Sequence, residues 1–196
     1  MSVYIKFIYI VICFLISLMY KNGISKRDLL LLRLALFFTA SADYFMLVAD
    51  NNRAGVYIFI LVQLIYIKRY GEINIKKAAV AIAGITLFYK YFLEADILIG
   101  GSLIYAFLFL KSMKAAVRAC GFDKFPYPNS FFILIGMFLL FICDTSVALY
   151  NILYMVWNID SSSLYFLIWF FYIPSQLLIL LSGRNFKAVP KKQNVY

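Results

Sequence analysis

The amino-acid sequence predicts an all-α membrane protein, a single polytopic bundle of seven transmembrane helices. Its 196 residues are 65% hydrophobic and 14% charged, whereas soluble domains contain about 45–50% apolar and about 25% charged residues. Runs of mostly apolar residues, each close to the ~20 residues that cross a bilayer, recur along the whole chain. The charged residues gather in the short segments between these runs, which leaves no room for a separate soluble domain.

Seven apolar runs define the predicted helices. They cover approximately residues 3–20, 29–48, 54–67, 78–92, 97–110, 131–151 and 164–181. The first run is followed by SLMYKNGISK, which has no small-x-small cleavage site, so we interpret the run as a span and not as a signal peptide. The second run ends at the polar DNNR, and KRYGEINIKK separates the third from the fourth.

Glycine and proline mark the ends and the weak points of the later helices. Gly100 and Gly101 loosen the start of the fifth helix, and GFDKFPYPNS separates the fifth from the sixth. The polar NIDSSS precedes the seventh helix, which Pro174 is expected to kink or open. We expect residues 1–183 to form one transmembrane domain and residues 184–196 to form a basic cytoplasmic tail.

Lysine and arginine alternate between the predicted loops. The first, third and fifth loops and the tail hold three, four, four and four of them, while the second, fourth and sixth loops hold one, none and none. Basic loops stay in the cytoplasm, so the pattern predicts an outside amino terminus and a cytoplasmic carboxyl terminus in a multi-pass protein of a bacterial cell membrane. Anionic lipid headgroups explain the net charge of +10 better than a nucleic-acid partner does.

The sequence lacks the residues of several kinds of site. It contains no histidine, which excludes Ser-His-Asp and Cys-His triads, HExxH zinc sites and histidine proton relays. Its three cysteines, Cys13, Cys120 and Cys143, are odd in number and form no CxxC pair, so we expect neither a disulfide framework nor a zinc site. We therefore expect no metal ion and no cofactor.

Two aspartates lie inside predicted spans. Asp43 is in LLLLRLALFFTASADYFMLV and Asp144 is in FFILIGMFLLFICDTSVALYN. A carboxylate in hydrocarbon costs about 3 kcal/mol on insertion scales, so such a residue faces a partner or a water-filled cavity, or carries a proton. Both spans run outward, and the rise of 1.5 Å per residue puts both aspartates roughly 10 Å below the outer surface. Equal depth permits a shared site in which one carboxyl group is the acid and the other the base.

The two aspartate spans also resemble each other weakly. FFTASADYFMLVADN is similar to LLFICDTSVALYN, and each is followed by a returning span with a buried glutamine, Gln63 or Gln176. Because both pairs have the same orientation, a duplication would give a parallel internal repeat. The alternative to a shared site is that each aspartate is a protonated or hydrogen-bonded residue of helix packing.

Five further polar residues are candidates for substrate binding: Lys6, Gln63, Lys90, Tyr172 and Gln176. The glutamines could orient a substrate or a water molecule, or could only join helices by hydrogen bonds. The tyrosine could serve the site or only pack. The two lysines lie near the outer ends of their spans, where they could bind a lipid phosphate or extend toward the headgroups.

The order of these residues resembles the YhhN-like lysoplasmalogenase family of integral membrane proteins. The resemblance covers nearly the whole chain and rests on YIKFIYIVICF with Lys6, SAD ending at Asp43, GVYIFILVQLIYI, LLFICDTSVALYN and FYIPSQLLILLS. The family usually has eight spans. Its glycine, serine, histidine and proline are replaced here, respectively, by Ala42, Cys143, Gln63 and Phe7.

The resemblance implies that the substrate is a lysophospholipid of the bilayer, a lysoplasmalogen, whose vinyl ether bond is hydrolysed to a fatty aldehyde and a glycerophospho-base. Asp43 and Asp144 would be catalytic, because vinyl ethers are cleaved by acid and two carboxyl groups suffice without a metal. Two alternatives stay open. The protein could be a transporter or binding protein for a cation or proton, or an inactive family member, since Gln63 cannot move a proton. An intramembrane aspartyl protease is disfavoured, because TASAD lacks the glycines of a Gly-x-Gly-Asp motif.

Overall fold

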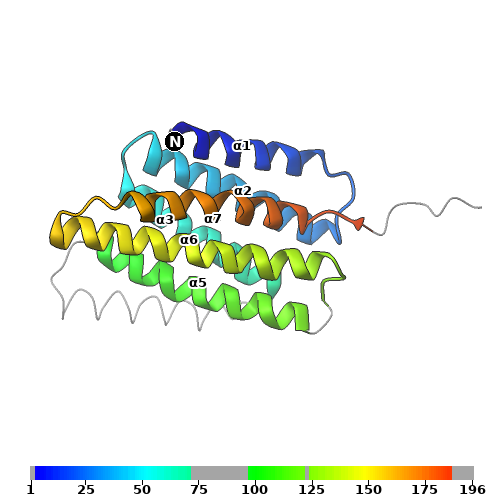
Figure 1. Cartoon of the computed structure of the whole chain (residues 1–196). Helices are drawn as coiled ribbons and strands as arrows, with labels where there is room; N and C mark the ends of the chain where they lie inside the picture. The colour runs from blue at the N-terminus through cyan, green and yellow to red at the C-terminus, as the bar shows by residue number, and fades with distance from the viewer. Residues whose placement is uncertain (1–2, 72–96, 122–123, 187–196) are drawn as a thin grey trace, which may run out of the picture.

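The computed structural model describes residues 3–71, 97–121 and 124–186, and the long elements within them are all α-helices (Figure 1). The helices are α1 (Val3–Met19), α2 (Lys26–Leu47), α3 (Asn52–Tyr70), α5 (Ile97–Gly121), α6 (Asn129–Trp157) and α7 (Ser162–Leu181). The all-α fold class is confirmed, and six of the seven predicted spans coincide with a helix. The span predicted at 78–92, with Lys90, lies outside the described residues.

Four of the described helices are long and apolar enough to cross a membrane. They are Lys26–Leu47, Leu98–Gly121, Asn129–Trp157 and Ser162–Leu181, and α1 is a shorter apolar helix. Large apolar side chains such as Leu110, Phe138 and Phe170 are half or more exposed on the outside of the bundle. Apolar surface of this kind is stable against lipid and unstable against water, so this chain is a membrane protein with transmembrane helices.

Two helices end later than predicted, and two predicted weak points lie inside continuous helices. The fifth helix does not end at 110 but continues to Gly121, and the sixth continues to Trp157. Gly101 does not open α5: it is buried, and a Cβ there would stand 3.2 Å from Val56 of α3, so the glycine permits a close approach of helices. α7 continues through Pro174, because neighbouring helices can support a proline within a membrane bundle.

The described helices pack in chain order and close into a ring. α1 contacts α2, α2 contacts α3, α3 contacts α5, α5 contacts α6, α6 contacts α7, and α7 returns to α1. Figure 1 shows the helices running side by side, with α7 between α1 and α6. The inward faces form one hydrophobic core that includes the fully buried Ile10, Leu36, Tyr66, Ile133 and Ile179. A side chain on an inward face therefore reaches elements far away in sequence.

Polar contacts gather several helix ends at one end of the bundle. Arg33 of α2 donates to the carbonyl of Tyr20, directly after α1, over 2.9 Å. Arg69, in the last turn of α3, donates over 3.2 Å to Asp28 at the start of α2 and over 3.0 Å to Ser182 after α7. We call this the basic end: α1, α3 and α7 finish there and α2 begins there. The contacts explain why loops predicted to share one side of a membrane meet in space.

Candidate functional site

Asp43 is held inside the bundle by residues of two other helices. Its side chain is 1% exposed, and the hydroxyl of Tyr172 on α7 donates a hydrogen bond to its Oδ2. The Nζ of Lys6 on α1 lies 3.6 Å from its Oδ1 and 4.3 Å from the centre of the Tyr172 ring. The carboxylate, the phenol and the ammonium group therefore form a compact cluster from α1, α2 and α7.

Lys6 makes a contact that neither interpretation from the sequence included. The side chain is 13% exposed and pairs with Asp43, so it does not extend toward the headgroups. An ammonium group buried in an apolar bundle is costly unless it is paired, and Asp43 supplies the pairing charge. Lys6 is therefore part of the aspartate cluster.

Asp144 has its own partners on α5 and α3. The hydroxyl of Tyr105 on α5 donates a hydrogen bond to its Oδ2. That hydroxyl accepts a bond of 3.3 Å from Nε2 of Gln63 on α3, whose Oε1 accepts a bond of 2.7 Å from Ser112. The hydrogen bonds therefore connect Ser112 on α5, Gln63 on α3, Tyr105 on α5 and Asp144 on α6 in that order. This chain of bonds holds the partly buried Asp144 carboxyl group in place.

The two aspartate clusters are electrostatically connected. Lys6 is close enough to interact with Asp144 as well as with Asp43, and the two carboxyl groups also interact with each other. Cys143, which precedes Asp144, is buried and donates through its sulfur to the carbonyl of Ile168 on α7. Lys6 therefore contacts Asp43 and also interacts electrostatically with Asp144.

The helix that follows each aspartate helix supplies a side chain to the cluster of the other aspartate. α3, which follows the Asp43 helix, carries Gln63 to the Asp144 cluster, and α7, which follows the Asp144 helix, carries Tyr172 to Asp43. Each half of the chain thus completes the site of the other half. Neither half of the chain therefore contains all the partners of its own aspartate.

Three buried polar atoms in the described part of the chain have no hydrogen-bond partner. They are Oδ1 of Asp43, the hydroxyl oxygen of Tyr66 and Oε1 of Gln176. Such atoms are rare in folded proteins because each unpaired group costs free energy. Gln176 is buried as predicted, at 1% exposure, and its free carbonyl oxygen can accept a bond from water or from a bound molecule.

Sequence reasoning missed Tyr105 and Ser112. Tyr105 is one of sixteen tyrosines, so its identity alone carries little information. Their spacing could have identified them, because Tyr105 and Ser112 are two turns apart on α5 and therefore face the same side of that helix. Of the residues predicted to serve the site, Asp43, Lys6 and Tyr172 meet in one cluster, and Asp144 and Gln63 meet in the other.

A shallow apolar hollow lies between α1 and α2, beside the Asp43 cluster along both helices. Its volume is about 270 Å³, and its lining contains Phe7, Val11, Phe14, Phe37, Ala40, Ser41, Tyr44 and Phe45. Two lining residues, Phe7 and Tyr44, follow Lys6 and Asp43 directly in sequence, and their ring centres are 5.8 Å apart. Apart from the hydroxyl groups of Ser41 and Tyr44, the hollow is lined by apolar side chains.

Comparisons with known proteins support the family resemblance. The sequence model of the YhhN family matches residues 1–183. No curated protein matches the chain, and no solved structure matches it.

Proposed function

Because this chain belongs to the YhhN family, we propose that it hydrolyses the vinyl ether bond of a lysoplasmalogen, as the resemblance to lysoplasmalogenases implies. The products are a fatty aldehyde and a glycerophospho-base. The observation that carries the proposal is the pair of carboxyl groups inside an apolar bundle. Each accepts a hydrogen bond from a tyrosine hydroxyl, and both interact electrostatically with the ammonium group of Lys6. Two carboxyl groups in different surroundings can divide acid and base roles.

We infer the two roles from the surroundings of each carboxyl group. Asp43 has a cation beside it, which stabilises the ionised carboxylate, so Asp43 is the base and stabilises positive charge on the substrate. Asp144 is bonded to an uncharged phenol and is the acid. The contacts of Lys6 are the basis of this division, since among the described residues only Asp43 forms an ion pair with it.

The reaction balances with one water molecule. Asp144 transfers its proton to the β-carbon of the vinyl ether, and the neighbouring carbon and oxygen share the positive charge of an oxocarbenium ion. Asp43 removes a proton from water as the water oxygen attacks that carbon, giving a hemiacetal. The carbon–oxygen bond to glycerol then breaks, the aldehyde forms, and the protons return to the glycerol oxygen and to Asp144. Acid and base steps of this kind contribute about 10²–10⁴-fold each.

The proposed substrate lies along the bundle. Its hydrocarbon chain occupies the hollow between α1 and α2, whose lining is mostly aromatic, and it enters from the outer leaflet of a seven-span protein. Lys6 is engaged by Asp43, so we assign it to positioning the carboxylate and not to binding phosphate. Lys90 remains the candidate for the substrate phosphate, while Gln63 and Gln176 orient groups inside the bundle.

Aldehyde release by the purified full chain tests the proposal. We expect the protein in detergent to release a fatty aldehyde from a lysoplasmalogen and none from the matching saturated ether lipid, because only the vinyl ether has a carbon that accepts a proton. Asp43→Asn and Asp144→Asn should each lower turnover by at least about 10²-fold. Asp160→Asn is the matched control, since that carboxylate is exposed in the loop after α6 and should keep full turnover.

The same experiment distinguishes the alternatives. Wild type without activity on every lysoplasmalogen would reject the enzyme proposal. Binding of a cation or proton that depends on Asp43 and Asp144 would then favour a transporter or binding protein, in which the bound cation or proton would compete with Lys6 for Oδ1 of Asp43. Absence of both activity and binding would favour an inactive family member.

A further inference from the structure

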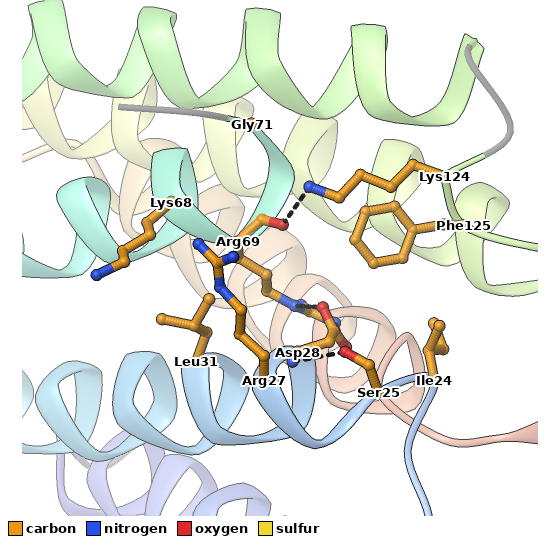
Figure 2. A pocket seen from close by; sticks show the side chains of 10 residues that line it. All are labelled: Ile24, Ser25, Arg27, Asp28, Leu31, Lys68, Arg69, Gly71, Lys124 and Phe125. Carbon is orange, nitrogen blue, oxygen red and sulfur yellow. Dashed lines mark hydrogen bonds and ion pairs between the residues drawn. The ribbon is translucent and has the colours of Figure 1, made fainter. Parts of the chain in front are cut away.

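A second hollow, unrelated to the aspartate clusters, opens at the basic end of the bundle. Its volume is about 310 Å³ (Figure 2). The lining comes from the start of α2, the end of α3 and the loop before α6: Ile24, Ser25, Arg27, Asp28, Leu31, Lys68, Arg69, Gly71, Lys124 and Phe125. Asp28 and Asp43 are separated by about 22 Å along α2 at 1.5 Å per residue, so this hollow is distinct from the proposed active site.

Arg69 and Asp28 form the rigid floor of this hollow. The Nε and Nη2 of Arg69 donate to the two oxygens of Asp28 over 2.9 and 3.2 Å, and Nη2 also donates to Ser182 over 3.0 Å. The Arg69 side chain is fully buried, and Asp28 is 8% exposed. Both carboxylate oxygens are thus occupied by one guanidinium group, an arrangement with fixed planar geometry. Asp28 therefore has little capacity left to neutralise other cations.

Three more cationic groups line the hollow beyond this ion pair. Figure 2 shows Arg27 reaching from α2 toward the last turn of α3, and Lys124 approaching from the loop before α6. With Lys68 and Arg69 the lining contains four cationic side chains and one carboxylate, which leaves a net charge of +3. Lys124 donates to the carbonyls of Arg69 and Tyr70, 3.1 Å each, and an ammonium group has a third hydrogen to donate.

The remaining walls suit a phosphate that is attached to a lipid. Ile24, Leu31 and Phe125 give the hollow an apolar side. We propose that this hollow binds the phosphate group of an anionic phospholipid, with Arg27, Lys68 and Lys124 contacting the phosphate and the apolar side contacting the glycerol and the first part of the chains. Basic pockets between transmembrane helices bind headgroups of this class.

Lipid binding by the purified full chain tests this proposal without any use of its activity. The probe is dioleoylphosphatidylglycerol added to protein in neutral detergent, with dioleoylphosphatidylcholine as the zwitterionic control, and native mass spectrometry measures the bound fraction. Arg27→Gln with Lys68→Gln should weaken binding of the anionic lipid by at least about tenfold, because each basic group near a lipid surface contributes measurably to affinity. Both side chains are exposed, so the fold should survive.

The matched control removes the same charge elsewhere. Lys114→Gln with Arg118→Gln changes two exposed cations of α5 that do not line the hollow, and it should bind the anionic lipid as wild type does. Equal loss in both double variants, or no loss in either, would overturn the proposal, because binding would then follow net charge or ignore the hollow. If the first double variant fails to fold, Lys68→Gln alone must show a loss in the same direction.

Inorganic phosphate distinguishes the source of the phosphate group. Competition by inorganic phosphate against the bound anionic lipid supports a site that recognises the phosphate itself. Should inorganic phosphate bind in a manner that depends on Arg27 and Lys68 while the anionic lipid does not bind, the phosphate site stands and the lipid source is rejected.

Discussion

Individual side chains around Asp43 and Asp144 differ in a way that matters for chemistry. Lys6 gives Asp43 an ion-pair partner, whereas the hydrogen bond to Asp144 comes from Tyr105. Gln63 uses one amide atom to donate to Tyr105 and the other to accept from Ser112. A neutral histidine, the residue that the family has at this position, also offers one donor and one acceptor. Gln63 thus holds Tyr105 and Ser112 by hydrogen bonds, but an amide cannot transfer a proton as a histidine can.

At the residue scale, the pairing of Lys6 with Asp43 predicts non-additive effects on stability. Lys6→Met leaves a buried carboxylate without its cation and should destabilise the protein by about 3 kcal/mol or more. Lys6→Met combined with Asp43→Asn should recover much of that loss, because neither charge then remains unpaired. Thermal unfolding of the four proteins of the cycle in detergent measures the coupling. Lys26→Met, at an exposed position of α2, is the control and should change little; strict additivity of the two site changes would contradict the pairing.

At the scale of elements, the packing of α1 and α2 creates a hollow that neither helix has alone. α2 contributes to two sites. Its start lines the hollow at the basic end, and its last turns carry Asp43. The most extensive packing is between α6 and α7, where a Cβ on Gly136 would stand 3.0 Å from Ile179. This close approach fixes α7, and with it Tyr172, relative to α6. Helix contacts therefore position the tyrosine that Asp43 requires.

The hollow between α1 and α2 gives a prediction about substrate affinity. Ser41 lines it, and its hydroxyl donates a hydrogen bond to the Phe37 carbonyl of the same helix. Ser41→Trp should fill the space proposed for the hydrocarbon chain, so KM for a long-chain lysoplasmalogen should rise with little change in kcat.

The matched control for this prediction is Ser102→Trp. Ser102 is exposed on α5 and makes the same kind of bond to Leu98, but it does not line the hollow. Steady-state kinetics on both variants compare the two positions. An unchanged KM for Ser41→Trp would place the chain elsewhere on the protein.

For the whole molecule, the ring of helices explains how distant sequence positions meet. α7 closes the ring against α1, which brings Tyr9 of α1 within 2.9 Å of the Ile173 carbonyl and Lys6 onto Tyr172. The same closure places the basic segments together at one end and the Asp43 cluster toward the other. The molecule thus has two chemically different ends along the direction of its helices.

This polarity leads to a prediction about orientation in the membrane. Because basic segments stay in the cytoplasm, the basic end should face inward, with the amino terminus outside and the carboxyl terminus inside. Ser2→Cys and Tyr196→Cys, each in a Cys120→Ser background, can be labelled in intact cells with a membrane-impermeant maleimide. Ser2→Cys should react before permeabilisation and Tyr196→Cys only after it. Labelling of both from the same side would contradict a seven-span topology.

From sequence alone, the fold class, six of the seven predicted helices and the two aspartates inside them could be predicted. These features are local: about twenty apolar residues define a span wherever it lies, and a carboxylate within such a run is unusual in any fold. The breaks at DNNR and GFDKFPYPNS were predicted for the same reason, since they depend on turn-forming residues and not on partners. The aromatic and amide partners Tyr172 and Gln63 were also selected from sequence, although the aspartate that each serves was not.

Only the tertiary structure decided which side chains meet. The inward direction of Lys6, the choice of Tyr105 among sixteen tyrosines and the burial of Arg69 on Asp28 depend on how each helix is rotated against its neighbours. The apolar pattern of a membrane helix does not fix that rotation, because lipid and protein interior are similarly apolar. Packing and buried polar contacts fix it instead, and both require the other helices to be in place.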